Sequence, residues 1–187
     1  STKVLAPVNG SIQLGDGGTG VIAQVNAFCF FNKTIGMYAN FYYLINPRDQ
    51  NGVTTTTGNT PTANQVKYGN DVYSVPEVYS IRGCFNVSFN KLAISAGLRD
   101  EGVPVRDLAG GNYGLRRPGH NLSAEPGVLY KIKNTSVYAY VPVLVARNIK
   151  QSLPDKEMQA NVVGFDPKKS TGGSGNFVVF MGVLFKL

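Results

Sequence analysis

The stretch from residue 78 to residue 98, VYSIRGCFNVSFNKLAISAGL, decides the fold of this chain. Apolar residues from Tyr79 to Phe89 alternate with polar ones, and the alternation resumes at Leu92 after a tight turn at Asn90 and Lys91. Side chains with a period of two point to opposite faces of a β-strand. The stretch therefore predicts an antiparallel hairpin with one apolar and one polar face.

The same pattern recurs along the chain and predicts an all-β fold without helical periodicity. Further strands are expected at 21–31, 35–45, 122–132, 136–148 and 177–187. These strands are longer than the roughly 5–6 residues usual in soluble sheets, and they match the roughly 9–11 residues of a membrane-crossing strand. Tight turns alternate with long connections rich in Gly, Pro, Asn and Ser, near residues 9–20, 47–76, 102–119 and 149–175.

Short turns at one end and long loops at the other are typical of transmembrane barrels. The sequence thus predicts one domain over residues 1–187, an antiparallel up-and-down transmembrane β-barrel. The barrel has about eight strands, of which residues 2–13 supply the eighth. Alternatively, the chain is the C-terminal part of a larger barrel. The alternative is a soluble β-sandwich binding module, whose strands alternate in the same way with the apolar face inward.

Composition excludes several classes of protein. The 187 residues carry 18 Lys and Arg against 11 Asp and Glu, a net charge of +7. Charged residues make up only 16% and aromatic residues 11%, which excludes a disordered chain and a coiled coil. Two cysteines are too few for a disulfide scaffold or a four-cysteine zinc site. There is no run of Lys and Arg that indicates nucleic acid binding, and we expect no metal or cofactor site.

The tight turns predict which polar side chains meet. If Phe89 faces Leu92, then Arg82 lies opposite Arg99, with Glu101 and Glu125 nearby on the same polar face. This cluster is interpreted either as an anion-favouring constriction or as a salt-bridge plug that fills a small barrel. If Phe31 faces Ile35, then Asn26 lies opposite Asn40, as a hydrated layer or a packed polar core.

Loop residues suggest lipid contact, and one possible enzyme site is rejected. Arg116, Arg117, Lys168 and Lys169 are candidates for binding lipid phosphates, the alternative being solvated loop charge. His120 and Ser123 resemble part of a catalytic triad, but their spacing puts them on opposite strand faces. We therefore predict no enzyme.

Two pairs of residues concern the regularity of the strands. Pro126 and Pro142 lie at nearly the same height on neighbouring predicted strands, so we expect a bulge or bend there. Cys29 on an apolar face and Cys84 on a polar face point to opposite sides, so we expect both thiols to be free.

The end of the chain is similar to a known class of protein. Its alternating residues Met181, Val183, Phe185 and Leu187 resemble the C-terminal strand of Gram-negative outer-membrane β-barrels. Other stretches resemble a poorly characterised group of porin- or transporter-like barrels, namely 97–104, 107–111, 116–119, 125–127, 141–143 and 147–148.

The resemblance implies a location in the bacterial outer membrane, assembly by the barrel-assembly machinery, and contact with outer-membrane lipid including lipopolysaccharide. It also implies a pore for small polar or anionic solutes. The alternative is a closed structural barrel whose long loops bind protein partners or lipid.

Overall fold

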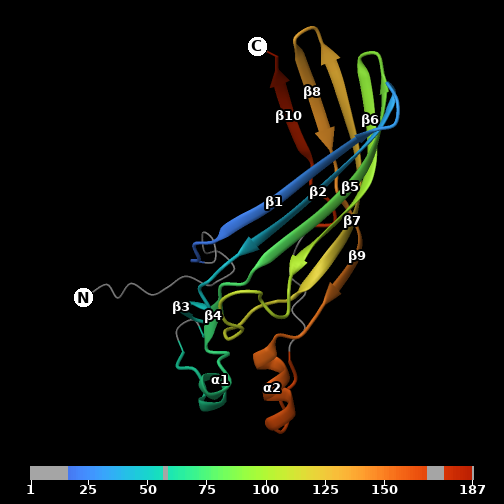
Figure 1. Ribbon diagram of the computed structural model, residues 1–187. Helices are drawn as coiled ribbons and strands as arrows, with labels where there is room; N and C mark the ends of the chain where they lie inside the picture. Colours follow the sequence, from blue (N-terminus) through green and yellow to red (C-terminus); the bar gives the residue numbers. More distant parts are fainter. Residues whose placement is uncertain (1–16, 57–58, 168–174, 187) are drawn as a thin grey trace, which may run out of the picture.

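The computed structural model describes residues 17–56, 59–167 and 175–186, and its main element is a curled antiparallel β-sheet (Figure 1). The all-β prediction is confirmed. Seven strands follow one another in the order β1-β2-β5-β6-β7-β8-β10, and β9 pairs with β7. The strands are β1 (Val21–Phe30), β2 (Ile35–Ile45), β5 (Val78–Phe89), β6 (Leu92–Val103), β7 (Gly119–Ile132), β8 (Thr135–Tyr140), β9 (Val143–Ile149) and β10 (Phe180–Phe185).

Tight turns at one end of the sheet, here called the turn end, fix the strand register. Asn90 and Lys133 open two-residue turns with φ of 52°, the left-handed conformation that hairpin turns need. Between β1 and β2, the Asn32 side chain accepts hydrogen bonds from the backbone of Thr34 and Ile35, both at 2.8 Å. The predicted pairs Asn26–Asn40 and Arg82–Arg99 are both confirmed.

The opposite end, here called the long-loop end, contains short elements that the sequence analysis missed. Within 47–76, β3 (Gln50–Thr54) pairs with β4 (Val72–Ser74), and α1 (Ala63–Lys67) lies between them. The connection 149–175 contains α2 (Leu153–Asn161). The prediction of no helical segment is therefore wrong, because capping by Thr62 and Ser152 starts helices too short for clear periodicity.

Neither helix of the described residues is long and apolar enough to span a bilayer.

The bend expected at the two prolines is present and divides a predicted strand. The segment 136–148 forms β8 and β9 instead of one strand, with a break at Val141 and Pro142. The backbone of Val141 donates to the carbonyl oxygen of Pro126 at 2.9 Å, so the two prolines lie side by side. Because proline lacks the N–H that a sheet ladder needs, the strand changes its path there.

The two edges of the sheet are β1 and β10. No described residue pairs with the outer side of either strand, so the described part of the chain forms an open, curled sheet and not a closed barrel. Every pairing along the path from β1 to β10 is antiparallel. Both edge strands therefore run toward the turn end (Figure 1). Residues 2–13, the suggested further strand, lie outside the described residues, and β10 is shorter than the predicted 177–187.

The concave face of the sheet is polar. Arg82 on β5 and Tyr140 on β8 are three strand spacings apart, about 14 Å along a flat sheet. Nevertheless the Arg82 guanidinium lies 4.7 Å from the centre of the Tyr140 ring. Side chains converge in this way only on the inner side of a curved sheet, so the face with Arg82 is concave.

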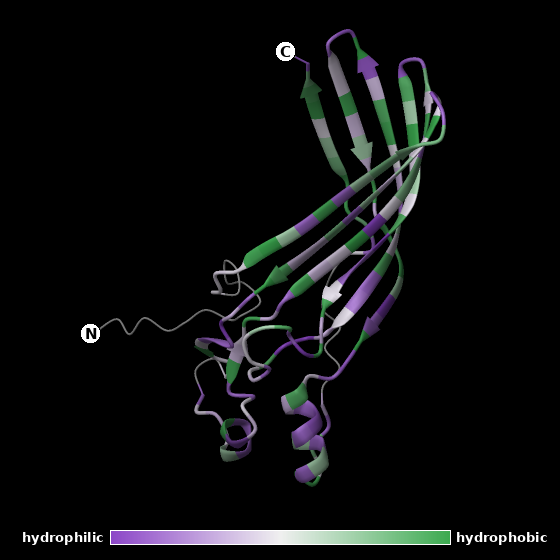
Figure 2. Cartoon of the chain, in the orientation of Figure 1, coloured by the Kyte–Doolittle hydropathy of each residue, from purple (hydrophilic) through white to green (hydrophobic). Residues whose placement is uncertain are grey.

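The convex face is apolar and exposed. Hydrophobic and hydrophilic residues alternate along the strands, as the colours in Figure 2 show. Val25, Phe85 and Leu98 expose 64%, 58% and 56% of their surface. In the described residues, the buried hydrophobic side chains are only Val75, Cys84 and Met158. The sheet thus lacks the apolar core that a water-soluble domain forms. Its apolar side chains point outward and its polar side chains point inward, the reverse of the arrangement in such a domain.

Conventional packing is confined to the long-loop end. The fully buried side chains there include Val75, Glu77, Pro118, Ser152 and Pro154. The Asn70 amide of the α1 segment donates to the Asp155 carboxylate of α2 at 3.1 Å, which joins the two helical segments. We call this part, residues 46–77 and 104–118 with α2, the loop layer.

Candidate functional site

The structure brings together four predicted residues on the concave face, Arg82, Arg99, Glu101 and Glu125, here called the charged band. The Glu125 carboxylate contacts the guanidinium groups of both Arg82 and Arg99, with 2.9 Å from Arg99 Nε to Glu125 Oε2. Glu101 lies farther out, 3.6 Å from Arg99 Nη1. The Glu125 side chain is 1% exposed, whereas that of Glu101 is 41% exposed.

Register explains why these groups meet. Arg82 pairs with Arg99 across β5 and β6, and two residues further toward the turn end Gly97 pairs with Glu125 across β6 and β7. Because Gly97 has no side chain, Glu125 reaches between the two arginines. A Cβ at residue 97 would collide with Cys84 and the backbone of Gly83, so this position needs glycine.

Aromatic rings surround the two arginines. The Arg82 guanidinium lies 5.0 Å from the ring centre of Tyr38, and that of Arg99 lies 5.6 Å from the ring centre of Phe180. Tyr140 contacts both guanidinium groups, and it stacks on Phe180 with 4.8 Å between ring centres. Each cation lies at a distance where the ring's electron density attracts it. Tyr140 and Phe180 were not predicted, because β8 and β10 reach the charged band only through the curvature of the sheet. Tyr38 stands on β2, next to the strand of Arg82.

The predicted Asn26 and Asn40 extend the charged band across β1 and β2. Asn40 lies beside Arg82 in the register, and its amide donates to Asn26 Oδ1 at 2.7 Å. Asn26 is exposed on the concave face. One continuous polar row therefore crosses the sheet from β1 to Arg99, and its β1 end is open to water.

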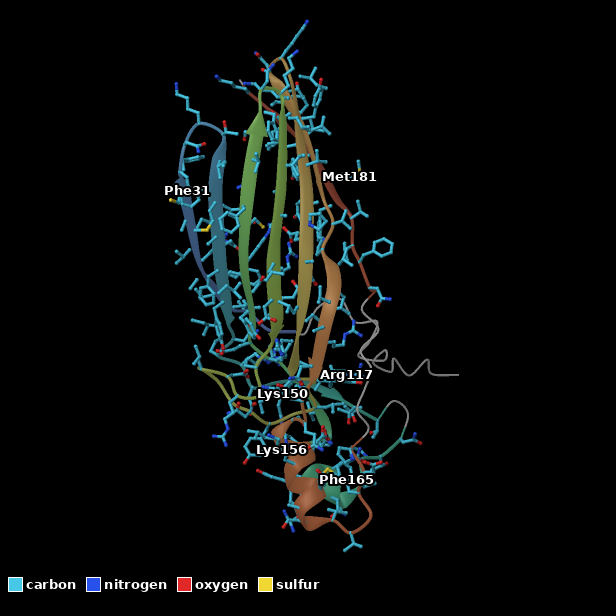
Figure 3. All side chains as sticks on the ribbon, turned by 90° about the vertical axis from the view of Figure 1, so that its right-hand side faces the viewer. Phe31, Arg117, Lys150, Lys156, Phe165 and Met181 are labelled. Carbon is cyan, nitrogen blue, oxygen red and sulfur yellow. The ribbon has the colours of Figure 1, made fainter. Side chains whose placement is uncertain are left out.

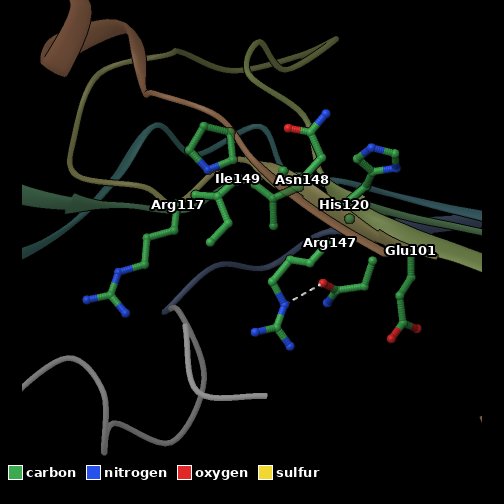
Figure 4. A pocket seen from close by; sticks show the side chains of 11 residues that line it. Glu101, Arg117, His120, Arg147, Asn148 and Ile149 are labelled. Atoms are coloured by element: carbon green, nitrogen blue, oxygen red, sulfur yellow. Dashed lines mark hydrogen bonds between the residues drawn. The ribbon is translucent and has the colours of Figure 1, made fainter. Parts of the chain in front are cut away.

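Two cavities lie beside the charged band toward the long-loop end. The first, of about 150 Å³, is lined by Glu101, Arg117, His120 and Arg147 among others (Figure 4). Arg117, Arg147 and Glu101 extend to one side of the strands in this view, and His120 points to the other side. The second, of about 100 Å³, is lined by Arg99, Glu101, Arg147 and Phe180 among others. Arg147 was not predicted, because regular alternation from Val143 and Val145 places it on the apolar face. A register shift between Leu122 and Ser123 brings it opposite Asn121 on the concave face.

Of the four residues predicted to bind lipid phosphates, the structure describes Arg116 and Arg117, and these two differ in exposure. Arg116 is not exposed, which corrects the prediction: its guanidinium is fully buried and donates to Asp107 at 2.7 Å. Burial raises the pKa of the Asp107 carboxyl above its ordinary value, and the Arg116 guanidinium opposes that rise. Arg117 is exposed near Lys150 and Lys156 at the long-loop end (Figure 3). Lys168 and Lys169 lie outside the described residues.

The buried carboxylate of Glu77 holds the loop layer against the sheet. Its oxygens accept hydrogen bonds from the backbone of Leu108 at 2.6 Å and Ala109 at 3.0 Å. The Tyr43 hydroxyl donates to the same carboxylate at 2.6 Å. No local sequence signal marks Glu77, because its partners are about thirty residues away along the chain.

Replacing Glu77 with Ala is expected to release the segment 104–112. The backbone N–H groups of Leu108 and Ala109 lose their acceptor, which costs about 1–3 kcal/mol for each unsatisfied group. Tryptic cleavage after Arg106 should therefore become at least about tenfold faster, because local opening precedes cleavage. Glu157→Ala, on the exposed side of α2, is the matched control. Equal cleavage rates in the two variants would contradict the role of Glu77.

The residues considered for catalysis are separated as predicted. The His120 ring nitrogen Nδ1 lies 2.8 Å from Asp100 Oδ1 on the convex face. Ser123 pairs with Arg99 on the concave face, where it is 6% exposed. Cys29 and Cys84 are both free thiols, as expected. In the described residues no group of three or more His, Cys, Asp or Glu side chains is placed to hold a metal ion.

No protein family model, curated protein or solved structure matches this chain.

Proposed function

We propose that the chain forms the wall of an outer-membrane pore for small polar or anionic solutes. The observation that carries the proposal is the inverted sheet, whose convex face is apolar and exposed while its concave face is polar and charged. Monomeric soluble proteins rarely expose a continuous apolar patch beyond about 300–600 Å². When the same face contacts lipid, its apolar surface is not exposed to water. Transmembrane barrels alternate in this way, with apolar side chains outside and polar side chains inside.

The height of the apolar face supports the same proposal. The convex apolar residues of β7 run from Leu122 to Ile132. At about 3.3 Å per residue and a tilt of about 40°, this segment rises about 25 Å, the usual height of the apolar band in outer-membrane barrels. The cluster of Asp100, His120 and Tyr79 lies at its long-loop end, where polar side chains begin.

The charges of the concave face favour anions. This face carries a surplus of positive charge, because its three arginines outnumber its two glutamates: Arg82, Arg99 and Arg147 against Glu101 and Glu125. A pore lined with arginine attracts anions and repels cations, because the field is focused between low-dielectric walls. We therefore expect anion preference, not a neutral channel.

A second candidate function is a closed barrel that serves structure or interaction. The observation in its favour is the burial of Glu125 between two arginines, because such an ion pair fills space in a narrow lumen. In that case the loop layer would bind protein partners or lipid, and the charged band would only stabilise the fold.

Gel mobility and conductance test both candidates. Unboiled protein extracted from membranes should run as a compact, fast band that shifts on heating, and it should conduct ions with anion preference in planar bilayers. Arg99→Gln should reduce that preference by about twofold or more, because one of the lumen cations is lost. Lys156→Gln removes the same charge from exposed α2 and should leave the preference unchanged.

The outcomes separate the alternatives. A heat-modifiable band without conductance would replace the pore with the closed barrel. Protein found in the soluble fraction without a mobility shift would contradict both and favour a soluble β-sandwich.

A further inference from the structure

The smaller cavity beside the charged band combines cationic and aromatic groups. Its volume is about 100 Å³, and its lining includes Arg99, Arg147, Glu101, Phe177 and Phe180. It lies where β6, β7 and β9 meet the segment that leads into β10. A cavity of roughly 150 Å³ encloses benzene, so this smaller one holds only part of an aromatic ring.

The cationic side of the cavity comes from two strands. Arg99 stands on β6, and Arg147 stands on β9, where its Nε donates to Asn121 Oδ1 at 3.1 Å. The Glu101 carboxylate lies 3.6 Å from Arg99, beyond a close ion pair, and its side chain is 41% exposed. A carboxylate so placed is easily replaced by the carboxylate of a ligand, because little burial or packing holds it.

The apolar side of the cavity is a flat surface. Phe180 lies 5.6 Å from the Arg99 guanidinium and stacks on Tyr140. Phe177 lines the same cavity and is 64% exposed. Aromatic faces bind another ring in an offset stack, and guanidinium groups bind carboxylates in a bidentate manner.

We propose that this cavity binds small aromatic carboxylates: the ligand carboxylate replaces Glu101 at Arg99, Arg147 supplies a second positive charge of the lining, and the ligand ring packs on Phe180. The inference rests on the proposed pore and names the class of solute that the pore selects. A solute with this combination of charge and flat apolar surface would rest at the charged band before it moves on.

Calorimetric titration of the full chain in detergent, with benzoate as the probe, tests the site. Benzoate should bind, and acetate, without the ring, and benzylamine, with the opposite charge, should bind much more weakly. Arg147→Gln should weaken benzoate binding about tenfold, because one of the two cations that line the cavity is lost while the amide still reaches Asn121. Phe180→Leu should weaken it about fivefold, and Glu101→Gln should strengthen it.

Two control variants match these changes. Lys150→Gln removes a cation from an exposed position close to Arg147 along the chain. Phe185→Leu removes a ring from the same strand β10, where Phe185 is 73% exposed. Both should bind benzoate as the unmodified chain does. Equal weakening by a variant and its control would overturn the site.

Conductance of the same samples distinguishes failure of the site from failure of the pore. Conduction without benzoate binding would refute the site and keep the pore. Benzoate binding without conduction would keep the site and refute the pore.

Discussion

Replacing Glu125 with Gln is expected to lower the free energy of unfolding by about 3–5 kcal/mol, the usual cost of removing one partner of a buried ion pair. Glu125 is 1% exposed and contacts two guanidinium groups. Its loss leaves the two arginines facing each other, with the exposed Glu101 beside Arg99 as the only remaining carboxylate of the charged band. Arginine does not escape this penalty by losing its proton, because a guanidinium group stays protonated in proteins. Urea unfolding of vesicle-refolded protein, followed by tyrosine fluorescence, measures the effect.

Glu101→Gln is the matched control for this prediction. The same chemical change at a side chain that is 41% exposed should cost about 1 kcal/mol or less. The double variant Arg82→Gln with Glu125→Gln should lose less than the sum of the two single variants, because it removes one of the uncompensated cations. Equal effects of Glu125→Gln and Glu101→Gln would show that Glu125 does not neutralise the arginines.

Replacing Phe85 with Arg is expected to reduce assembly into lipid vesicles severely. Phe85 is 58% exposed at the middle of the apolar part of β5, where the proposed barrel faces lipid. A charged residue near the bilayer midplane costs about 2–4 kcal/mol on the lipid face of a barrel. The fraction of heat-modifiable protein after refolding into vesicles measures the loss.

Two variants of β5 make this prediction specific to the face. Asn86→Arg places the same charge one residue along, on the concave face beside Gly36 and Ser95, and should assemble normally. Phe85→Leu keeps an apolar side chain and should also assemble. Normal assembly of Phe85→Arg would mean that the convex face does not meet lipid.

The strands and their register follow from the sequence because each hairpin is local. The two-residue turn at Asn90 fixes the pairing of Arg82 with Arg99, and the period of two then places their side chains on one face. For Glu125 the period of two gave only the face, because β6 and β7 are joined by the long connection 104–118 and not by a tight turn. The pairing of the two arginines was therefore predictable residue by residue, whereas the height of Glu125 on β7 was not.

The rest depends on distances that no local pattern encodes. Tyr140 and Phe180 reach the arginines only because the sheet curls, and the strand order alone does not give the degree of curling. Arg116 is buried by contacts within the loop layer, so its charge wrongly indicated an exposed residue. Glu77 was not predicted, because its partners are distant along the chain. α2 has few apolar residues, and only the capping residue Ser152 and Pro154 mark its start.

The shared direction of β1 and β10 restricts how copies of this chain associate. Suppose that two copies insert with their loop layers on the same side of a membrane. The β1 edge of one copy then meets the β10 edge of the other as parallel neighbours, whereas every existing ladder of the main sheet is antiparallel. Dimerisation through these edges would need a ladder type foreign to the rest of the sheet. The edges therefore discourage self-association and favour a partner strand of opposite direction.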